Sequence, residues 1–150
     1  MQRLSSAFII FILFFSLENI YAGEKMCIEI IPLGSTDKFI PDYLKEHLSD
    51  IFDAQVYLGE SKALPEYAYN KKRGQYLSSA ILDNLTKSKN DNRQKTLAII
   101  NKDLYAHRLN FVFGEAKPAK GVCIISITRL YPSYYGLKQD NEILLKRTLK

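Results

Sequence analysis

The chain has 150 residues, of which 47% are hydrophobic and 25% are charged, which suits one domain with a core and excludes a wholly disordered chain. Its formal net charge of +5 is modest, and its densest basic cluster is the short run Lys71–Arg73. Nucleic-acid binding needs a basic face or a recognisable binding motif, and neither is present, so we predict no nucleic-acid partner.

Residues 1–22 have the three parts of a secretory signal peptide. Arg3 precedes an apolar run over 7–17, and Ala22-Gly23 provides small residues at a cleavage point. The apolar run is much shorter than the roughly 20 residues that a membrane-spanning helix needs, and polar residues follow it directly. We therefore predict export to the periplasm or the medium, no stable membrane anchor after cleavage, and one mature domain over 23–150; an uncleaved anchor is the disfavoured alternative.

The first half of the mature chain alternates between strand and helix patterns. Pro41 suits the first position of a helix, and the apolar residues after it recur at helical spacing. An irregular stretch with proline and glycine breakers lies between the second strand and the second helix. The predicted elements are strands over 27–33 and 55–58 and helices over 41–52 and from Gln75 to about Thr86.

The second half is dominated by apolar strand patterns, which we place at 96–100, 111–116 and 122–130. The first of these is apolar throughout, as in a strand that is buried on both faces of a sheet. A short loop joins the other two, so we predict an antiparallel hairpin. A final amphipathic helix begins with Asn141 as its cap, and its apolar stripe is still running at Lys150.

The resulting order, β-α-β-α-β-β-β-α, indicates the fold class. Alternation in the first half implies parallel strands joined by right-handed crossovers, and the hairpin adds an antiparallel strand. We therefore predict an α/β fold with a mixed, mostly parallel sheet and helices packed on it. The sequence shows no internal repeat and no second domain.

Few side chains suggest a self-sufficient active site. His47 lies among the polar positions of the first predicted helix, and His107 lies in a loop with no second histidine nearby, so both are poor zinc ligands. Cys123 with His107 is a conceivable nucleophile pair, but Cys123 lies in an apolar strand, where a buried thiol is inert. Asp103 closes a strand, which is a frequent location both for catalytic groups and for residues that cap loops. Cys27 and Cys123 can pair in an exported protein only if their strands are neighbours.

Three stretches resemble a known protein family. They read YNKKRGQY at 69–76, LAIINKDLYAHRLNFVF at 97–113 running on into GEA, and VCIISITRL at 122–130. In this order and spacing they resemble the archaemetzincins, a family of zinc metallopeptidases, over nearly all of the mature chain. The most specific elements are RGQY and DLY…LNFVFG.

The resemblance implies that the chain is the upper half of a zincin-like metallopeptidase domain. In that family the last helix continues into HExxHxxGxxH, whose histidines hold zinc and whose glutamate is the general base for a zinc-bound water. The sequence contains no such motif. The resemblance thus implies zinc as the cofactor but assigns no metal ligand and no catalytic residue here, and we expect a domain truncated just before the motif.

The resemblance also implies that the strand at 111–116 is an antiparallel edge strand above the cleft, where an extended peptide can bind by main-chain pairing. The candidate substrate-binding residues are Phe111, Val112, Phe113, Gly114, Glu115 and Ala116. The alternative is an ordinary strand whose phenylalanines lie in the core. The same sheet order places another strand between those of Cys27 and Cys123; strands two apart lie roughly 9–10 Å from each other, so we expect two free thiols.

The predicted function is therefore that of the amino-terminal part of an exported zinc-dependent peptidase, inactive in these 150 residues alone. The alternative is a non-catalytic exported module that binds a peptide or protein partner through the strand at 111–116, and an unrelated α/β domain is a weaker third option. A short helix fragment is marginally stable by itself, and a sheet face left bare promotes aggregation, so truncation is favoured over an adapted module.

Overall fold

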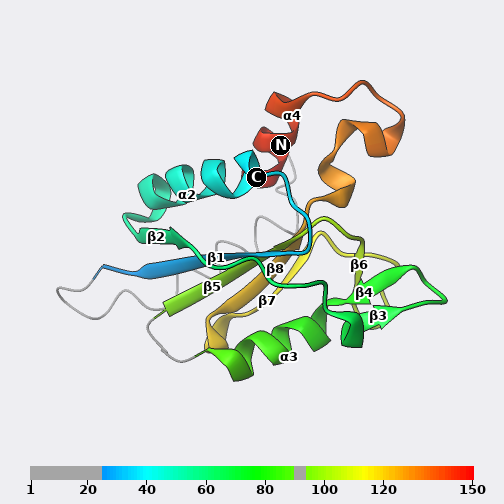
Figure 1. Ribbon diagram of the computed structural model, residues 1–150, viewed down its shortest axis with the longest axis horizontal. Coiled ribbons are helices and arrows are strands. Elements are labelled where there is room, and N and C mark those ends of the chain that lie inside the picture. The colour runs from blue at the N-terminus through cyan, green and yellow to red at the C-terminus, as the bar shows by residue number, and fades with distance from the viewer. Residues whose placement is uncertain (1–24, 90–93) are drawn as a thin grey trace, which may run out of the picture.

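A computed structural model of the chain describes residues 25–89 and 94–150, so the signal peptide predicted over 1–22 lies outside the described residues. Within the described part, no helix is long and apolar enough to cross a membrane. The main element is a five-stranded sheet in the order β2-β1-β5-β8-β7 (Figure 1). Its strands are β1 (Cys27–Leu33), β2 (Gln55–Leu58), β5 (Gln94–Ile100), β7 (Gly114–Lys117) and β8 (Val122–Ser126).

A second, smaller sheet lies beyond one end of the main sheet (Figure 1). It has the order β3-β4-β6 and consists of β3 (Tyr69–Asn70), β4 (Gln75–Leu77) and β6 (Leu104–Tyr105). The helices are α2 (Phe39–Phe52), α3 (Ser78–Ser88) and α4 (Asn141–Leu149), with short 3-10 turns at Glu66–Ala68, Pro118–Lys120, Thr128–Leu130 and Pro132–Tyr135.

The strand directions in the main sheet confirm the predicted fold class. β1 runs parallel to both β2 and β5, and β5 runs parallel to β8. β7 is antiparallel to β8 and lies at the edge of the sheet. The structure is therefore an α/β fold with a mostly parallel sheet and one antiparallel edge strand.

The apolar residues of β5 divide between two cores because successive side chains of a strand point to opposite faces. Leu97 and Ile99 belong to the core under α2 and α4, whereas Ala98 and Ile100 belong to the core under α3. Figure 1 shows this arrangement, with α2 and α4 on one face of the sheet and α3 on the other. The fully apolar pattern of this strand follows from burial on both faces.

Two helix boundaries differ from those predicted. The first helix begins at Phe39, before the expected Pro41. The second begins at Ser78, because Gln75–Leu77 forms β4 and pairs with β6. The Tyr76 N–H donates to the Asp103 carbonyl at 2.9 Å, a long-range partner that outweighs the local helical pattern.

The two strands of the predicted hairpin are also shorter or shifted. β8 ends at Ser126, and a 3-10 turn replaces its predicted continuation to residue 130. The edge strand begins at Gly114, so Phe111, Val112 and Phe113 precede it. Val112 instead bridges to Leu104 of the small sheet.

The last helix, α4, is capped by Asp140 and not by the predicted Asn141. The Asp140 carboxylate accepts a hydrogen bond from the Ile143 N–H at 3.0 Å, which satisfies a free amide of the first turn. Leu144 is fully buried in the core that it shares with α2. Leu145 and Leu149 are partly buried against the same core, so the helix packs on the domain through three leucines.

The sheet order confirms the prediction for the cysteines. β5 separates the strand of Cys27 from the strand of Cys123. Both thiols are free; Cys123 is buried and Cys27 is half-buried. Burial raises the pKa of the Cys123 thiol, which makes it a poor nucleophile and argues against a pair with His107.

Candidate functional site

The open edge of β7 is the first part of the candidate site. The Ser126 N–H donates to the Phe113 carbonyl at 2.7 Å, which makes these two residues a hydrogen-bonded pair of the antiparallel ladder. Such pairs alternate along the ladder, so Glu115 also bonds to β8, whereas the main-chain groups of Gly114 and Ala116 point away from it. The outward N–H and C=O groups of these two residues are available to another extended chain.

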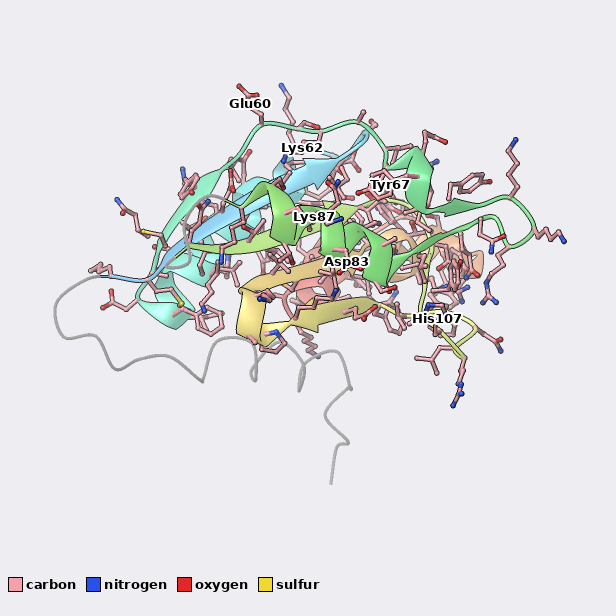
Figure 2. The ribbon with its side chains drawn as sticks, turned by 90° about the horizontal axis from the view of Figure 1, so that it is seen from below. Glu60, Lys62, Tyr67, Asp83, Lys87 and His107 are labelled. Atoms are coloured by element: carbon pink, nitrogen blue, oxygen red, sulfur yellow. The ribbon has the colours of Figure 1, made fainter. Side chains whose placement is uncertain are left out.

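Side chains from α3 fix one face of β7. The Ser78 hydroxyl donates to the Glu115 carboxylate, and the Lys117 ammonium forms an ion pair with Asp83. The hydrogen bond from Lys117 lowers the pKa of Asp83. Figure 2 shows Asp83 on α3, the helix that crosses this face of the sheet. These contacts hold the strand by its side chains and leave its outer main-chain edge open.

Gly114 has a packing reason to be glycine. A Cβ at this position would lie 2.6 Å from the carbonyl oxygen of Ile124 and 3.3 Å from the Ile125 side chain. Since the Ile124 carbonyl oxygen is part of the β8 backbone, the contact cannot be relieved by rotating a side chain. The absence of a side chain therefore allows the edge strand to begin in close contact with β8.

A polar network lies at the end of the sheet from which β7 starts. The Arg129 guanidinium donates from Nε to Asp103 Oδ1 and from Nη2 to Asp103 Oδ2, each at 2.7 Å. The Gln75 amide donates to the same carboxylate at 2.8 Å. Partial burial alone would raise the pKa of Asp103, but the hydrogen bonds from Arg129 and Gln75 outweigh it, and the pKa lies below its ordinary value. Asp103 is thus held as a carboxylate.

The same network reaches the segment in front of the edge strand. Gln75 Nε2 also donates to the Asn110 carbonyl at 2.9 Å. Arg73 Nη2 donates to the carbonyls of Leu109 and Asn110, at 3.1 and 2.9 Å. The Arg129 guanidinium lies over the Phe111 ring, 3.9 Å from its centroid. The network therefore joins the RGQY stretch, the DLY stretch and the strand-to-helix connection.

An apolar cavity of about 340 Å³ lies between α2, the sheet and the C-terminal end of α4. Leu44 and Leu48 of α2 and Leu97 and Ile125 of the sheet line it. Phe113 also lines it, so the cavity extends to the segment that leads into β7.

Comparison with known proteins supports a common family. No family model matches the chain. An archaemetzincin from Methanopyrus kandleri is 40% identical over 126 residues, which cover 80% of this chain and 63% of that protein. An archaemetzincin from Pyrococcus abyssi is 33% identical over 127 residues, covering 81% of this chain and 68% of that protein. The crystal structure of the archaemetzincin from Archaeoglobus fulgidus matches with a TM-score of 0.69 and 31% identity, covering 83% of this chain and 71% of that one.

The chain belongs to the archaemetzincin family. Identity at this level over most of the described chain, together with the shared fold, confirms the family predicted from the three sequence stretches. The chain spans about two thirds of the length of these two archaemetzincins, 63% of one and 68% of the other.

Membership of the archaemetzincin family implies zinc, which needs a cluster of histidine, cysteine or carboxylate ligands. In residues 25–89 and 94–150, no three His, Cys, Asp or Glu side chains gather closely enough to hold a metal ion. His47 Nδ1 lies 2.9 Å from the Tyr43 carbonyl in its own helix. His107 lies in the turn that follows β6 (Figure 2). The part of the archaemetzincin domain that is described here does not by itself make up a zinc site.

The predicted substrate-binding residues divide into two groups in this archaemetzincin chain. Gly114, Glu115 and Ala116 lie in the edge strand, whereas the three residues before them form its approach. The alternative placed both Phe111 and Phe113 in the core. Phe111 is 38% exposed and does not lie in the core. Its ring meets that of Phe113 edge-on, with centroids 5.5 Å apart.

Sequence reasoning did not find the roles of Arg73, Gln75 and Arg129. The first two were present in the RGQY stretch, which supported the family resemblance without showing what its side chains contact. The sequence suggested Asp103 only as a carboxylate at a strand end. In the structure this carboxylate accepts hydrogen bonds from Arg129 and Gln75. The sequence offers little signal for such a network, because the burial of Gln75 is visible only in the folded structure.

Proposed function

We propose that this chain is the peptide-binding part of an exported, zinc-dependent peptidase, and that the open edge of β7 is its substrate-binding strand. The observation that supports this most is the outward direction of the main-chain groups of Gly114 and Ala116. Membership of the archaemetzincin family adds support for a peptide substrate and for zinc.

The physical basis for peptide binding is main-chain pairing. The N–H and C=O groups of Gly114 and Ala116 offer four hydrogen bonds to an extended peptide. Each such bond contributes about 0.5–1.5 kcal/mol net, so pairing alone gives weak binding and mainly fixes the direction and register of the peptide. Side-chain contacts, for instance with Phe113 and the cavity beside it, supply the rest of the affinity.

The zinc-binding and catalytic groups are proposed to lie outside these 150 residues. This rests on the absence of an HExxH motif from the sequence and on the chain spanning only part of its relatives. We therefore expect that the purified chain neither binds zinc tightly nor cleaves peptides. Stoichiometric zinc in metal analysis of the purified chain, retained after dialysis against a weak chelator, would contradict this expectation.

Peptide binding can be tested by NMR. A valine- and threonine-rich extended peptide is titrated into the labelled chain, and a copy that is N-methylated at every residue, and so has lost the N–H donors of both its edges, is the control. We expect the amide signals of Gly114 and Ala116 to shift with the first peptide only. Shifts that map elsewhere, or equal binding of the methylated copy, would argue against the edge of β7.

Two further measurements address the complete protein. The coding sequence after Lys150 should contain HExxHxxGxxH; unrelated sequence there would favour the non-catalytic module. Export predicts that the mature protein recovered from the periplasm or the medium begins near Gly23. A cytoplasmic protein that keeps Met1 would contradict export.

A further inference from the structure

We propose that Arg73, Gln75, Asp103 and Arg129 are positioning residues that fix the approach segment, residues 109–113, and thereby the start of edge strand β7. This inference rests on the proposed function in one respect only, namely that β7 receives the peptide. The network itself stands on contacts within the chain.

Each residue of the approach segment contacts a fixed element. The carbonyls of Leu109 and Asn110 accept hydrogen bonds from Arg73, and that of Asn110 also accepts one from Gln75. The Phe111 ring lies against the Arg129 guanidinium, 3.9 Å from centroid to carbon. The Val112 N–H donates to the Leu104 carbonyl at 2.9 Å, and the Phe113 carbonyl accepts from β8. Gly114 follows at once, so the path of this segment sets the position of the edge.

Hydrophobic packing holds only the end of this segment, where Val112 packs on the core under α3 and Phe113 lines the apolar cavity. Leu109 is 52% exposed and Phe111 is 38% exposed, although both are large apolar residues. The part before Val112, with so little buried apolar surface, is expected to be mobile unless other contacts order it. The hydrogen bonds to its carbonyls and the contact between Arg129 and Phe111 are those contacts.

The network acts as a unit because its members hold one another. Arg73 Nε donates to the Gln75 side-chain oxygen at 2.9 Å, and the Gln75 amide nitrogen donates to Asp103. Asp103 in turn binds Arg129 through both carboxylate oxygens. The guanidinium that lies against Phe111 is therefore fixed by Asp103, and Asp103 is held by Gln75, which also donates to the Asn110 carbonyl. Loss of any one contact is expected to loosen the approach segment while leaving both cores intact.

Amide hydrogen exchange of the 150-residue chain, measured by NMR without peptide, tests this inference. The variant is Arg73→Ala, whose side chain is exposed and whose loss spares the cores. Lys72→Ala is the matched control, because it removes a neighbouring cation from the same turn. We expect exchange of the Val112 and Glu115 amides to rise tenfold or more in Arg73→Ala, with the central amides of β1 and β5 unchanged and the Lys72→Ala control like the parent.

Phe111→Ala is a second variant, which releases the segment from Arg129 without changing the ion pair, and it should give the same local increase. Unchanged exchange at Val112 in both variants, or an equal rise in β1 and β5, would overturn the inference. The titration with the valine- and threonine-rich peptide is then repeated on Arg73→Ala, where the dissociation constant should rise at least threefold at an unchanged unfolding midpoint. If the parent binds no peptide but its variants still loosen at Val112, the proposed function fails and the positioning network stands.

Discussion

Arg129 and Asp103 form a bidentate ion pair. The Nε and Nη2 atoms of the guanidinium each lie 2.7 Å from one oxygen of the carboxylate. Their side chains are 21% and 18% exposed, so the pair is largely but not wholly removed from water. Paired contacts of this kind fix geometry better than a single contact does, because both groups are planar and only one relative orientation satisfies both bonds. The pair joins a strand end of the sheet to the connection that leads to α4.

Replacing Asp103 with asparagine should destabilise the domain. Breaking a buried pair costs about 3–5 kcal/mol because a charge is left without its partner, and partial exposure reduces this to about 2–3 kcal/mol here. The free energy of unfolding in urea measures the loss. Asp83→Asn is the control, since the ion pair of Asp83 with Lys117 is more exposed and its loss should cost much less. Equal losses in the two variants would show that the Arg129 pair has no special role.

The same pair predicts a pH dependence. The pKa of Asp103 is lowered in the folded chain, so the stabilisation is fully present above the unfolded-state pKa, about 3.9, and is lost as the pH falls toward the folded-state value. We expect the stability difference between the parent and Asp103→Asn to be constant near neutral pH and to shrink below about pH 4. Urea unfolding at a series of pH values measures it. A difference that stays constant down to acid pH would mean that Asp103 titrates normally.

Elements were predicted correctly from the sequence where the local hydrophobic pattern matches the burial of the element in the folded chain. β1 has the predicted bounds, and the central strand is buried on both faces as its composition indicated. The start of the second helix was wrong because Gln75–Leu77 fits a helical pattern locally, while its main-chain partners lie in β6. Local periodicity cannot report a partner that is distant in the sequence.

Of the candidate site, the edge strand was predictable because its position follows from the order of strands in the sheet. The edge position of β7 came from the family resemblance, which the hairpin pattern supported. The network behind it was not predicted, because it joins residues far apart in the chain: Gln75 lies 28 positions from Asp103, and Asp103 lies 26 from Arg129. Single polar residues carry no periodic signal, so their partners emerge only from the folded structure.

Gly114→Ala should displace the start of the edge strand. The added methyl group would meet the Ile124 carbonyl at 2.6 Å, and overpacking of this kind costs about 1–3 kcal/mol. Ala116→Gly, two residues along the same strand, is the control and should cost about 0.5–1 kcal/mol through backbone entropy alone. Thermal unfolding ranks the two variants. If Gly114→Ala is as stable as the parent, the close contact between β7 and β8 is not maintained in solution.

Leu144→Ala tests whether α4 is an integral part of the domain. Leu144 is fully buried in the core with α2, and truncating a buried leucine costs about 2–5 kcal/mol. We expect a loss within that range. Ile143→Ala, at a position that is 41% exposed in the same helix, should cost about 1 kcal/mol or less. Similar small losses in both variants would mean that α4 is not packed on the sheet in solution.

The two cysteines should differ in reactivity and should not form a disulfide. Burial raises the pKa of Cys123, and the thiolate is the reactive form, so this residue should resist alkylation in the native chain. Cys27 is half-buried, with its thiol directed at the Gln55 side chain and the Lys25 carbonyl, and should react much faster. Iodoacetamide labelling followed by peptide mass spectrometry measures both rates, and Cys27→Ser leaves only the slow reaction. Denaturant should make the two rates equal, because the difference is a property of the fold. A native chain lighter by two hydrogens, or equal labelling rates before denaturation, would contradict the sheet order in which β5 separates the two strands.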